Sequence, residues 1–403
     1  MRRDSNRGTG RFSLQALPTG VWVLGLGSLF MDISSEMIHS LLPVFMASVL
    51  GASMVTIGII EGVAEATAAI TKVFSGALSD YLRRRKTVLV FGYALAALTK
   101  PVFPLAGSIA WVFGARFVDR IGKGIRGAPR DALVADIAPP EMRGAAYGLR
   151  QALDSVGAFL GPLLAVLLMI LFVNNIRHVM WVAVVPAVIT VVLLLVCLRE
   201  PARVSTGGGV PLHPDEVRRL PRHYWFVVVL GAVFTLARFS EAFLVLRAQN
   251  VGLGLEYVPV VMIVMNVFYA GFAYPAGVAA DRLSRRALLL IGLALLVAAD
   301  LVLAAASSAL PVLAGSALWG LHMAFTQGLL SKLVADNAPA DLRGTAFGLF
   351  NLVSGLALLL ASLIAGVLWS AYGPALTFLA GAAFATAGAL GLIIEGLRSA
   401  PTG

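Results

Sequence analysis

Three ionisable side chains, Asp32, Glu36 and His39, lie inside a stretch of sequence that is otherwise apolar enough to cross a membrane. Their spacing of four and then three residues places them on one face of a helix. A charge near the centre of a bilayer costs about 2.5–3.5 kcal/mol on insertion scales. We therefore expect this face to avoid lipid and to contact protein or a water-filled cavity, where carboxylates and an imidazole can bind protons or a polar molecule.

Five more ionisable residues lie near the middle of other apolar segments. They are Asp119 and Arg120 in the segment 109–132, Arg238 and Glu241 in the segment 224–249, and His322 in the segment 310–333. Acidic and basic groups occur in comparable numbers, so one interpretation is that they form ion pairs that only hold helices together. We favour a polar transport cavity, because ionisable groups inside membranes are usually functional.

The composition identifies an integral membrane protein. Of the 403 residues, 59% are hydrophobic and 13% are charged, and the mean hydropathy is +0.88. The apolar runs are long and continuous rather than alternating, so the spans are expected to be helices. The single cysteine, Cys197, excludes an internal disulfide framework. We interpret the net charge of +10 as a signal of topology and expect no nucleic-acid partner.

The apolar runs predict twelve transmembrane helices. They are expected at 19–48, 54–79, 87–106, 109–132, 144–172, 178–198, 224–249, 257–280, 287–306, 310–333, 344–370 and 373–396. The polar stretch 199–223 is expected to be a linker between an N-terminal half, 1–198, and a C-terminal half, 224–403. Basic residues cluster in the N-terminal tail and in alternate connections. The positive-inside rule therefore places both termini and the linker in the cytoplasm, and the chain in the inner cell membrane.

The two halves repeat each other in sequence. LVADIAPPEMRGAAYGL at 133–149 returns as LVADNAPADLRGTAFGL at 333–349, and GALSDYLRRR at 76–85 returns as GVAADRLSRR at 277–286. These offsets of about 200 residues predict two six-helix halves with parallel topology. Such halves are related by an axis along the membrane normal, and the substrate site is expected between them near the midplane.

These motifs resemble signatures of the major facilitator superfamily of secondary transporters, and the resemblance covers the whole chain. The residues that carry it are Gly76, Asp80, Arg84 and Arg85 in the loop signature, and Gly148, Gly157, Gly161 and Pro162 in the spacing of the antiporter motif. The resemblance implies an all-α fold in which the first, fourth, seventh and tenth spans line the cavity. It also implies a latch formed by Asp80, with Asp281 as its counterpart, and loop arginines.

Several of these residues also have a physical interpretation of their own. Small residues such as Gly157 let a neighbouring helix approach closely, and Pro162 removes a backbone donor and can bend its helix. Arg143 is expected to anchor Asp136 or the loop backbone. Lys100 is expected to extend its amine to the membrane surface.

Charged pairs inside two other spans are open to more than one interpretation. Glu61 and Glu65 are one helical turn apart and could carry protons if they are buried. Arg150 and Asp154 are also one turn apart and could neutralise each other.

The leading functional hypothesis is export of a small polar or ionic molecule by alternating access, as a proton antiporter. Glu36 and Asp32 are the first candidates for carrying the proton, with Arg238 or Arg120 as the cation that controls its release.

A second hypothesis is an exporter of a divalent transition metal that uses Asp32, Glu36, His39 and His322 as ligands. A third is a membrane receptor or membrane enzyme. The sequence contains no catalytic or phosphate-binding motif, so we expect no enzymatic activity and no cofactor. The expected partners are the substrate, protons and the lipid bilayer, and the expected state is a monomer.

Overall fold

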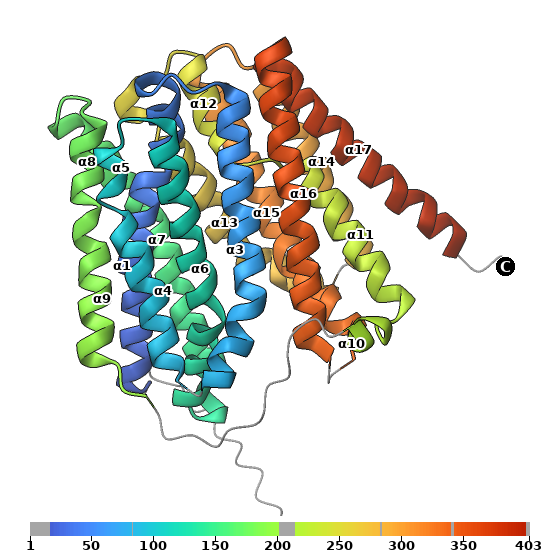
Figure 1. Cartoon of the computed structure of the whole chain (residues 1–403). Helices are drawn as coiled ribbons and strands as arrows, with labels where there is room; N and C mark the ends of the chain where they lie inside the picture. Colours follow the sequence, from blue (N-terminus) through green and yellow to red (C-terminus); the bar gives the residue numbers. More distant parts are fainter. Residues whose placement is uncertain (1–16, 83, 201–213, 283, 340–341, 400–403) are drawn as a thin grey trace, which may run out of the picture.

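The computed structural model describes residues 17–82, 84–200, 214–282, 284–339 and 342–399, and nearly all of them are helical (Figure 1). Eleven segments of this part are long and apolar enough to cross a membrane. A twelfth long helix, at the expected fourth span, is too polar to be recognised by hydropathy. The chain is therefore an integral, multi-pass membrane protein, and the prediction of an all-α membrane fold is confirmed.

The N-terminal half consists of α1 (Thr19–His39), α2 (Leu42–Val44), the π-helical turn η2 (Phe45–Val49), α3 (Met54–Leu82), α4 (Arg85–Thr99), α5 (Val102–Leu105), α6 (Ile109–Ile137), the 3-10 turn η3 (Pro140–Met142), α7 (Arg143–Leu171), α8 (Ile176–Val182) and α9 (Val184–Cys197). The following part consists of α10 (Pro214–Arg218), α11 (Arg222–Ala237), α12 (Ala242–Asn250), the 3-10 turn η4 (Leu255–Tyr257), α13 (Val260–Arg282), α14 (Arg285–Ala305), α15 (Ala309–Asn337), α16 (Arg343–Tyr372) and α17 (Pro374–Ser399). Most of the expected linker, 201–213, lies outside the described residues.

Local sequence signals end and start several of these helices. Ser284 caps α14, because its hydroxyl oxygen accepts a hydrogen bond from the amide of Ala287 at 3.2 Å. Gly373 ends α16 with a φ of +86°, a conformation that side chains with a Cβ rarely adopt. Pro374 follows at the first position of α17, where its missing amide proton costs no hydrogen bond.

The polar helix α6 crosses the protein because its charges face other helices. Arg116, Asp119, Arg120 and Arg126 are all buried, and α6 packs along both α3 and α4. Its apolar residues Trp111, Phe113 and Phe117 are exposed on the outside of the bundle. Because its charged face is buried against other helices and its apolar face is exposed, this helix can span a membrane despite its many charges.

The internal repeat recurs in one ion pair of each half. Arg85, at the start of α4, donates to the Asp136 carboxylate near the end of α6 at 2.8 Å. Arg285, at the start of α14, donates to the Asp336 carboxylate near the end of α15 at 2.7 Å. The pair therefore occupies the same place in both halves, at the connection between the second and third spans of each.

The two halves are in tight contact at the end of the bundle opposite the start of α1. α3 packs along α16, and a Cβ on Gly366 would lie 2.5 Å from the carbonyl oxygen of Met54. At the same end, the side-chain amide of Gln249 donates to the hydroxyl of Ser48 and links α12 to η2. The helices thus close this end of the space between the halves.

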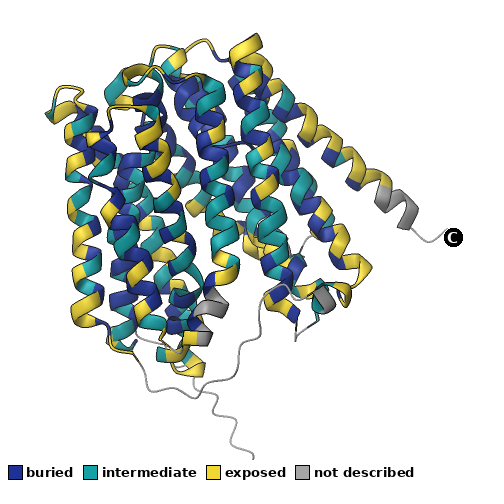
Figure 2. Cartoon of the chain, viewed as in Figure 1, coloured by how far each residue is buried: buried dark blue, intermediate teal, exposed yellow. Residues whose placement is uncertain are grey.

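Packing is looser toward the end where α1 begins. Residues 270–275 of α13 are all exposed, and so are Gly148 and Gln151 of α7. Much of the first part of α11, from Arg222 onward, is exposed as well (Figure 2). The halves are therefore held together at one end of the bundle and are more open at the other.

Candidate functional site

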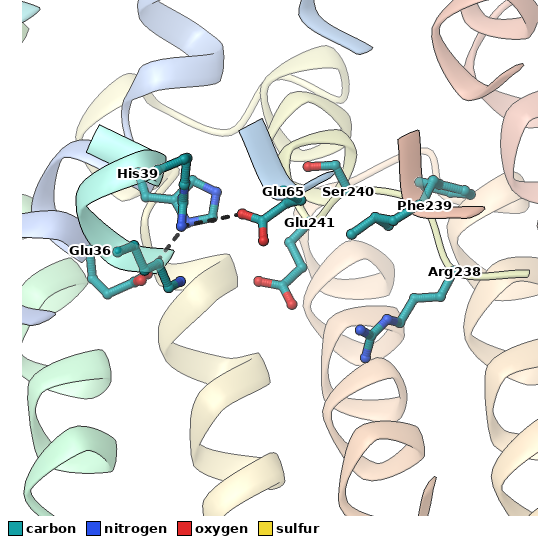
Figure 3. A pocket seen from close by; sticks show the side chains of 10 residues that line it. Glu36, His39, Glu65, Arg238, Phe239, Ser240 and Glu241 are labelled. Carbon is teal, nitrogen blue, oxygen red and sulfur yellow. Dashed lines mark ion pairs between the residues drawn. The ribbon is translucent and has the colours of Figure 1, made fainter. Parts of the chain in front are cut away.

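A cavity of about 170 Å³ lies between the two halves (Figure 3). From the N-terminal half it is lined by Glu36, His39, Glu65, Arg120 and Lys123. From the C-terminal half it is lined by Arg238, Phe239, Ser240, Glu241 and Leu358. Ionisable groups from both halves thus meet in one polar space, and they come from α1, α3, α6 and the segment between α11 and α12.

The residues from the C-terminal half project from an interruption in a helix. α11 ends at Ala237, α12 begins at Ala242, and the residues between them are not helical. The amide of Ser240 donates to the hydroxyl oxygen of Ser362 at 3.2 Å, and the amide of Ala242 donates to that of Ser240 at 3.3 Å. These side chains satisfy backbone groups that the interrupted helix cannot pair. Interrupted helices of this kind form substrate and ion sites in transporters.

On the opposite wall, His39 links two acidic residues. Its Nδ1 lies 3.5 Å from a carboxylate oxygen of Glu36, and its Nε2 lies 3.6 Å from one of Glu61. Arg116 donates to the same Glu61 oxygen at 2.7 Å. Glu61 and Arg116 are fully buried behind the cavity, whereas Glu36 and His39 face it. The chain of groups connects the cavity to a buried ion pair.

The other ionisable residues of the cavity differ in their partners. Glu65 lies 3.3 Å from the guanidinium of Arg120. Within the described part of the chain, Lys123, Arg238 and Glu241 each lack an ion pair, although all three face the cavity. Figure 3 shows the carboxylate of Glu241 and the guanidinium of Arg238 directed into the same space.

Asp32 lies one helical turn before Glu36, and its side chain is 27% exposed. Its carboxylate is 3.9 Å from the guanidinium of Arg126, which also stacks over the ring of Tyr93 at 4.6 Å from the ring centre. Asp32 does not line the cavity although it shares a helical face with Glu36. Asp32 thus lies beside a cation of α6, whereas the carboxylate of Glu36 lies beside His39 of its own helix.

Asp119 also departs from the expected position, because it is paired with Lys100. The Lys100 amine donates to the Asp119 carboxylate at 2.8 Å and to the Ser35 hydroxyl at 3.0 Å. The two charged side chains are only 2% and 6% exposed. The expectation that Lys100 reaches the membrane surface is therefore wrong, because a buried acid on α6 neutralises it inside the bundle.

His322 is buried in the C-terminal half and does not line the cavity. Its Nδ1 lies 2.8 Å from the carbonyl oxygen of Gly292, and its ring stacks on Phe234. Asp32 lies beside Arg126, and His322 lies beside Gly292. The four ligands of the metal-exporter hypothesis therefore do not come together at one point. No group of three or more His, Cys, Asp or Glu residues in the described part of the chain is arranged to hold a metal ion.

Two of the glycines that resemble the antiporter motif pack against α1. A Cβ on Gly157 would lie 2.9 Å from the Cβ of Asp32, and one on Gly161 would lie 2.7 Å from the Cβ of Glu36. Pro162 follows inside the same helix. Gly148 differs from the expectation: among the described residues, nothing lies within 4 Å of a Cβ built there. It is exposed near the start of α7.

The loop motif is only partly described. The surroundings of Gly76 and the side chains of Asp80 and Asp281 lie outside the described part, so the structure does not bear on the expected latch. Arg84 is exposed. Arg143 donates to the carbonyl oxygen of Ala135, in the last turn of α6, at 3.2 Å. The expected pairing of Arg150 with Asp154 is present at 2.8 Å.

Sequence reasoning missed Lys123 as a cavity residue. The available signal was its position three residues after Arg120, which places both on one face of α6. Phe239 and Ser240 were also missed as lining residues, because a break in an apolar helix leaves no clear mark in hydropathy.

The sequence matches the model of the Major Facilitator Superfamily over residues 24–266 and 227–402. An uncharacterized MFS-type transporter of Methanocaldococcus jannaschii is 33% identical over 377 residues, which cover 92% of this chain and 93% of the relative. The quinolone resistance protein NorA of Staphylococcus aureus is 21% identical over 218 residues, or 54% of each chain.

Solved transporter structures have the same fold. The nucleoside transporter NupG superimposes with a TM-score of 0.76 at 12% identity, covering 93% of this chain and 99% of that one. A POT family transporter in complex with 5-aminolevulinic acid gives a TM-score of 0.78 at 14% identity, covering 94% and 96%. At these identities the likeness concerns the fold alone.

Proposed function

The chain belongs to the major facilitator superfamily of transporters, and from this premise we propose that it exports a small polar or ionic molecule in exchange for protons. It is a transporter and not an enzyme. The observation that carries the proposal is the cavity in which ionisable side chains of both halves meet. A site placed between two halves can be exposed to each side of the membrane in turn.

The packing of the halves supports alternating access. They touch closely where Gly366 meets Met54, and they are looser where Gly148 and residues 270–275 are exposed. We propose that both termini and the linker 199–223 are cytoplasmic, so this conformation opens toward the cytoplasm. Rocking of the half 1–198 against the half 224–403 would then expose the cavity to the outside. The proposed unit is a monomer, because the cavity is complete within one chain.

Proton coupling is proposed at Glu36. Its carboxylate faces the cavity and lies 3.5 Å from His39, which can pass a proton to or from it. A carboxyl group that meets water in one conformation and is enclosed in another changes its affinity for a proton between the two states. Glu241 faces the same cavity from the other half and is the second candidate. The likeness to a resistance protein supports the outward direction of transport.

The proposal is tested with the full chain in proteoliposomes under an imposed pH gradient, with candidate substrates of several chemical classes. Glu36→Gln keeps nearly the same shape but cannot ionise. We expect it to abolish uphill transport driven by the gradient while leaving passive exchange of the substrate. Glu141→Gln, which changes an exposed residue outside the cavity, is the matched control.

Unchanged gradient-driven transport by Glu36→Gln would exclude Glu36 as the coupling residue and leave Glu241 to be examined in the same way. If the wild-type protein shows exchange that is independent of any pH gradient, proton coupling itself is wrong.

A further inference from the structure

The charges around the cavity fall into paired and unpaired groups. Glu65 pairs with Arg120 at 3.3 Å. Glu36, His39, Glu61 and Arg116 form one connected cluster, which is neutral when the histidine carries a proton. Behind the wall, Lys100 neutralises Asp119. These groups need no further partner, because each carboxylate already has a cation beside it.

Of the ionisable residues that line the cavity, three have no ion pair within the described part of the chain. Lys123 faces the cavity from α6, and Arg238 and Glu241 face it from the interrupted segment of the other half. When His39 carries a proton, these two cations and one carboxylate leave the cavity with an excess of one positive charge. While the cavity is open to water, this excess is solvated.

The excess charge becomes costly when the halves close around the cavity and expel water. An unpaired charge in a dry interior is strongly unfavourable unless a group of opposite sign accompanies it. A bound molecule with one net negative charge would remove this cost, whereas a bound cation would add to it. The charge balance therefore favours closure around an anion.

We propose that the substrate is a small organic monoanion whose carboxylate is held between Lys123 of one half and Arg238 of the other, an inference that rests on the proposed transport function. The guanidinium of Arg238 presents paired donors that match a carboxylate, and the Lys123 amine adds a point charge. Phe239 and Leu358 line the same space and offer apolar contact to the rest of the molecule. A ligand that bridges the two halves also favours the conformation in which they approach each other.

The effect of removing the charge of Glu241 on substrate affinity distinguishes an anionic substrate from a cationic one. Glu241 lies three residues from Arg238 in the same non-helical segment, and both side chains face the cavity. The ionised Glu241 therefore places a negative charge in the cavity that repels a substrate carboxylate. Removing the charge of Glu241 should strengthen the binding of an anion, whereas for a cationic substrate it should weaken binding.

The experiment measures equilibrium binding to the purified full-length protein in lipid nanodiscs, without any gradient, by titration calorimetry. The probes are benzoate and phenylacetate, their neutral amides benzamide and phenylacetamide, and the cation benzylamine. We expect the carboxylates to bind and the amides and the amine to bind at least about tenfold more weakly. Lys123→Gln and Arg238→Gln should each weaken carboxylate binding about tenfold or more, and Lys123→Arg should retain it.

Two further variants complete the test. Glu241→Gln should strengthen carboxylate binding, and Arg222→Gln, which removes an exposed cation outside the cavity, should leave it unchanged. A melting temperature close to that of the wild type shows that a variant is folded.

The inference is overturned if the amides or benzylamine bind as well as the carboxylates, or if no carboxylate binds. It also fails if Lys123→Gln and Arg238→Gln behave like Arg222→Gln. These outcomes are separate from failure of the proposed function, because gradient-driven transport of another substrate class and its loss in Glu36→Gln do not depend on anion binding.

Discussion

Gly161 of α7 lies directly against Glu36 of α1, so that a Cβ on the glycine would come within 2.7 Å of the Glu36 Cβ and 2.9 Å of the Ile33 carbonyl oxygen. One turn earlier, Gly157 stands in the same relation to Asp32. The glycines therefore set how closely α7 approaches the helix that carries the cavity acid. The motif in α7 and the cavity are parts of one packing arrangement.

We expect Gly161→Ala to impair transport by about tenfold or more, because the added methyl group would meet the Glu36 Cβ and backbone atoms of α1, none of which can move without the helix. Overpacking of this kind typically costs about 1–3 kcal/mol and here would displace Glu36. Gly148→Ala is the matched control in the same helix, because no described residue lies within 4 Å of the added methyl group. Transport rates of the two variants in proteoliposomes check the prediction, and equal rates would contradict it.

The buried ion pair of Lys100 and Asp119 should be sensitive to loss of one partner. We expect Lys100→Met to destabilise the protein by about 3–5 kcal/mol, because it leaves an uncompensated buried carboxylate. The double variant Lys100→Met with Asp119→Leu should recover most of this loss. Thermal unfolding in detergent measures both. A double variant no more stable than Lys100→Met would show that the pair is not what the substitution disrupts.

Asp300 of α14 is a buried carboxyl group that, unlike Asp119, has no cation beside it among the described residues. It is fully buried, and neither of its carboxylate oxygens has a hydrogen-bond partner among the described residues. An unsatisfied buried polar group costs about 1–3 kcal/mol, so we expect Asp300→Leu to leave the melting temperature unchanged or to raise it. Asp300→Asn keeps the polar group and should give no such gain. A marked fall in the melting temperature of Asp300→Leu would reveal a partner for the carboxyl group.

The proposed orientation predicts that residue 222 is reached only from the cytoplasm. Arg222→Cys in a Cys197→Ser background places a single exposed thiol at the start of α11. A membrane-impermeant maleimide should label it in lysed cells and inverted vesicles but not in intact cells. Labelling of intact cells would reverse the topology and, with it, the assignment of the open end.

The sequence by itself determined the number and order of the spans and the repeat between the halves. Long apolar runs predict membrane helices because every backbone polar group in a bilayer must be paired within its own segment. The fourth span, 109–132, is the least apolar of the twelve, because many of its residues are charged.

Only the tertiary structure decided which ionisable residues meet. Asp32 and Glu36 share a helical face, yet Arg126 lies beside the first, while the second faces the cavity. Lys100 and Asp119 pair across two helices whose mutual rotation no pattern in either one specifies. Helical periodicity fixes which residues of one helix lie together, but the partner of a charge depends on the rotation and depth of its neighbours. The rotation and depth of each helix are set by side-chain packing throughout the bundle. One example is the close contact between Gly161 of α7 and Glu36 of α1.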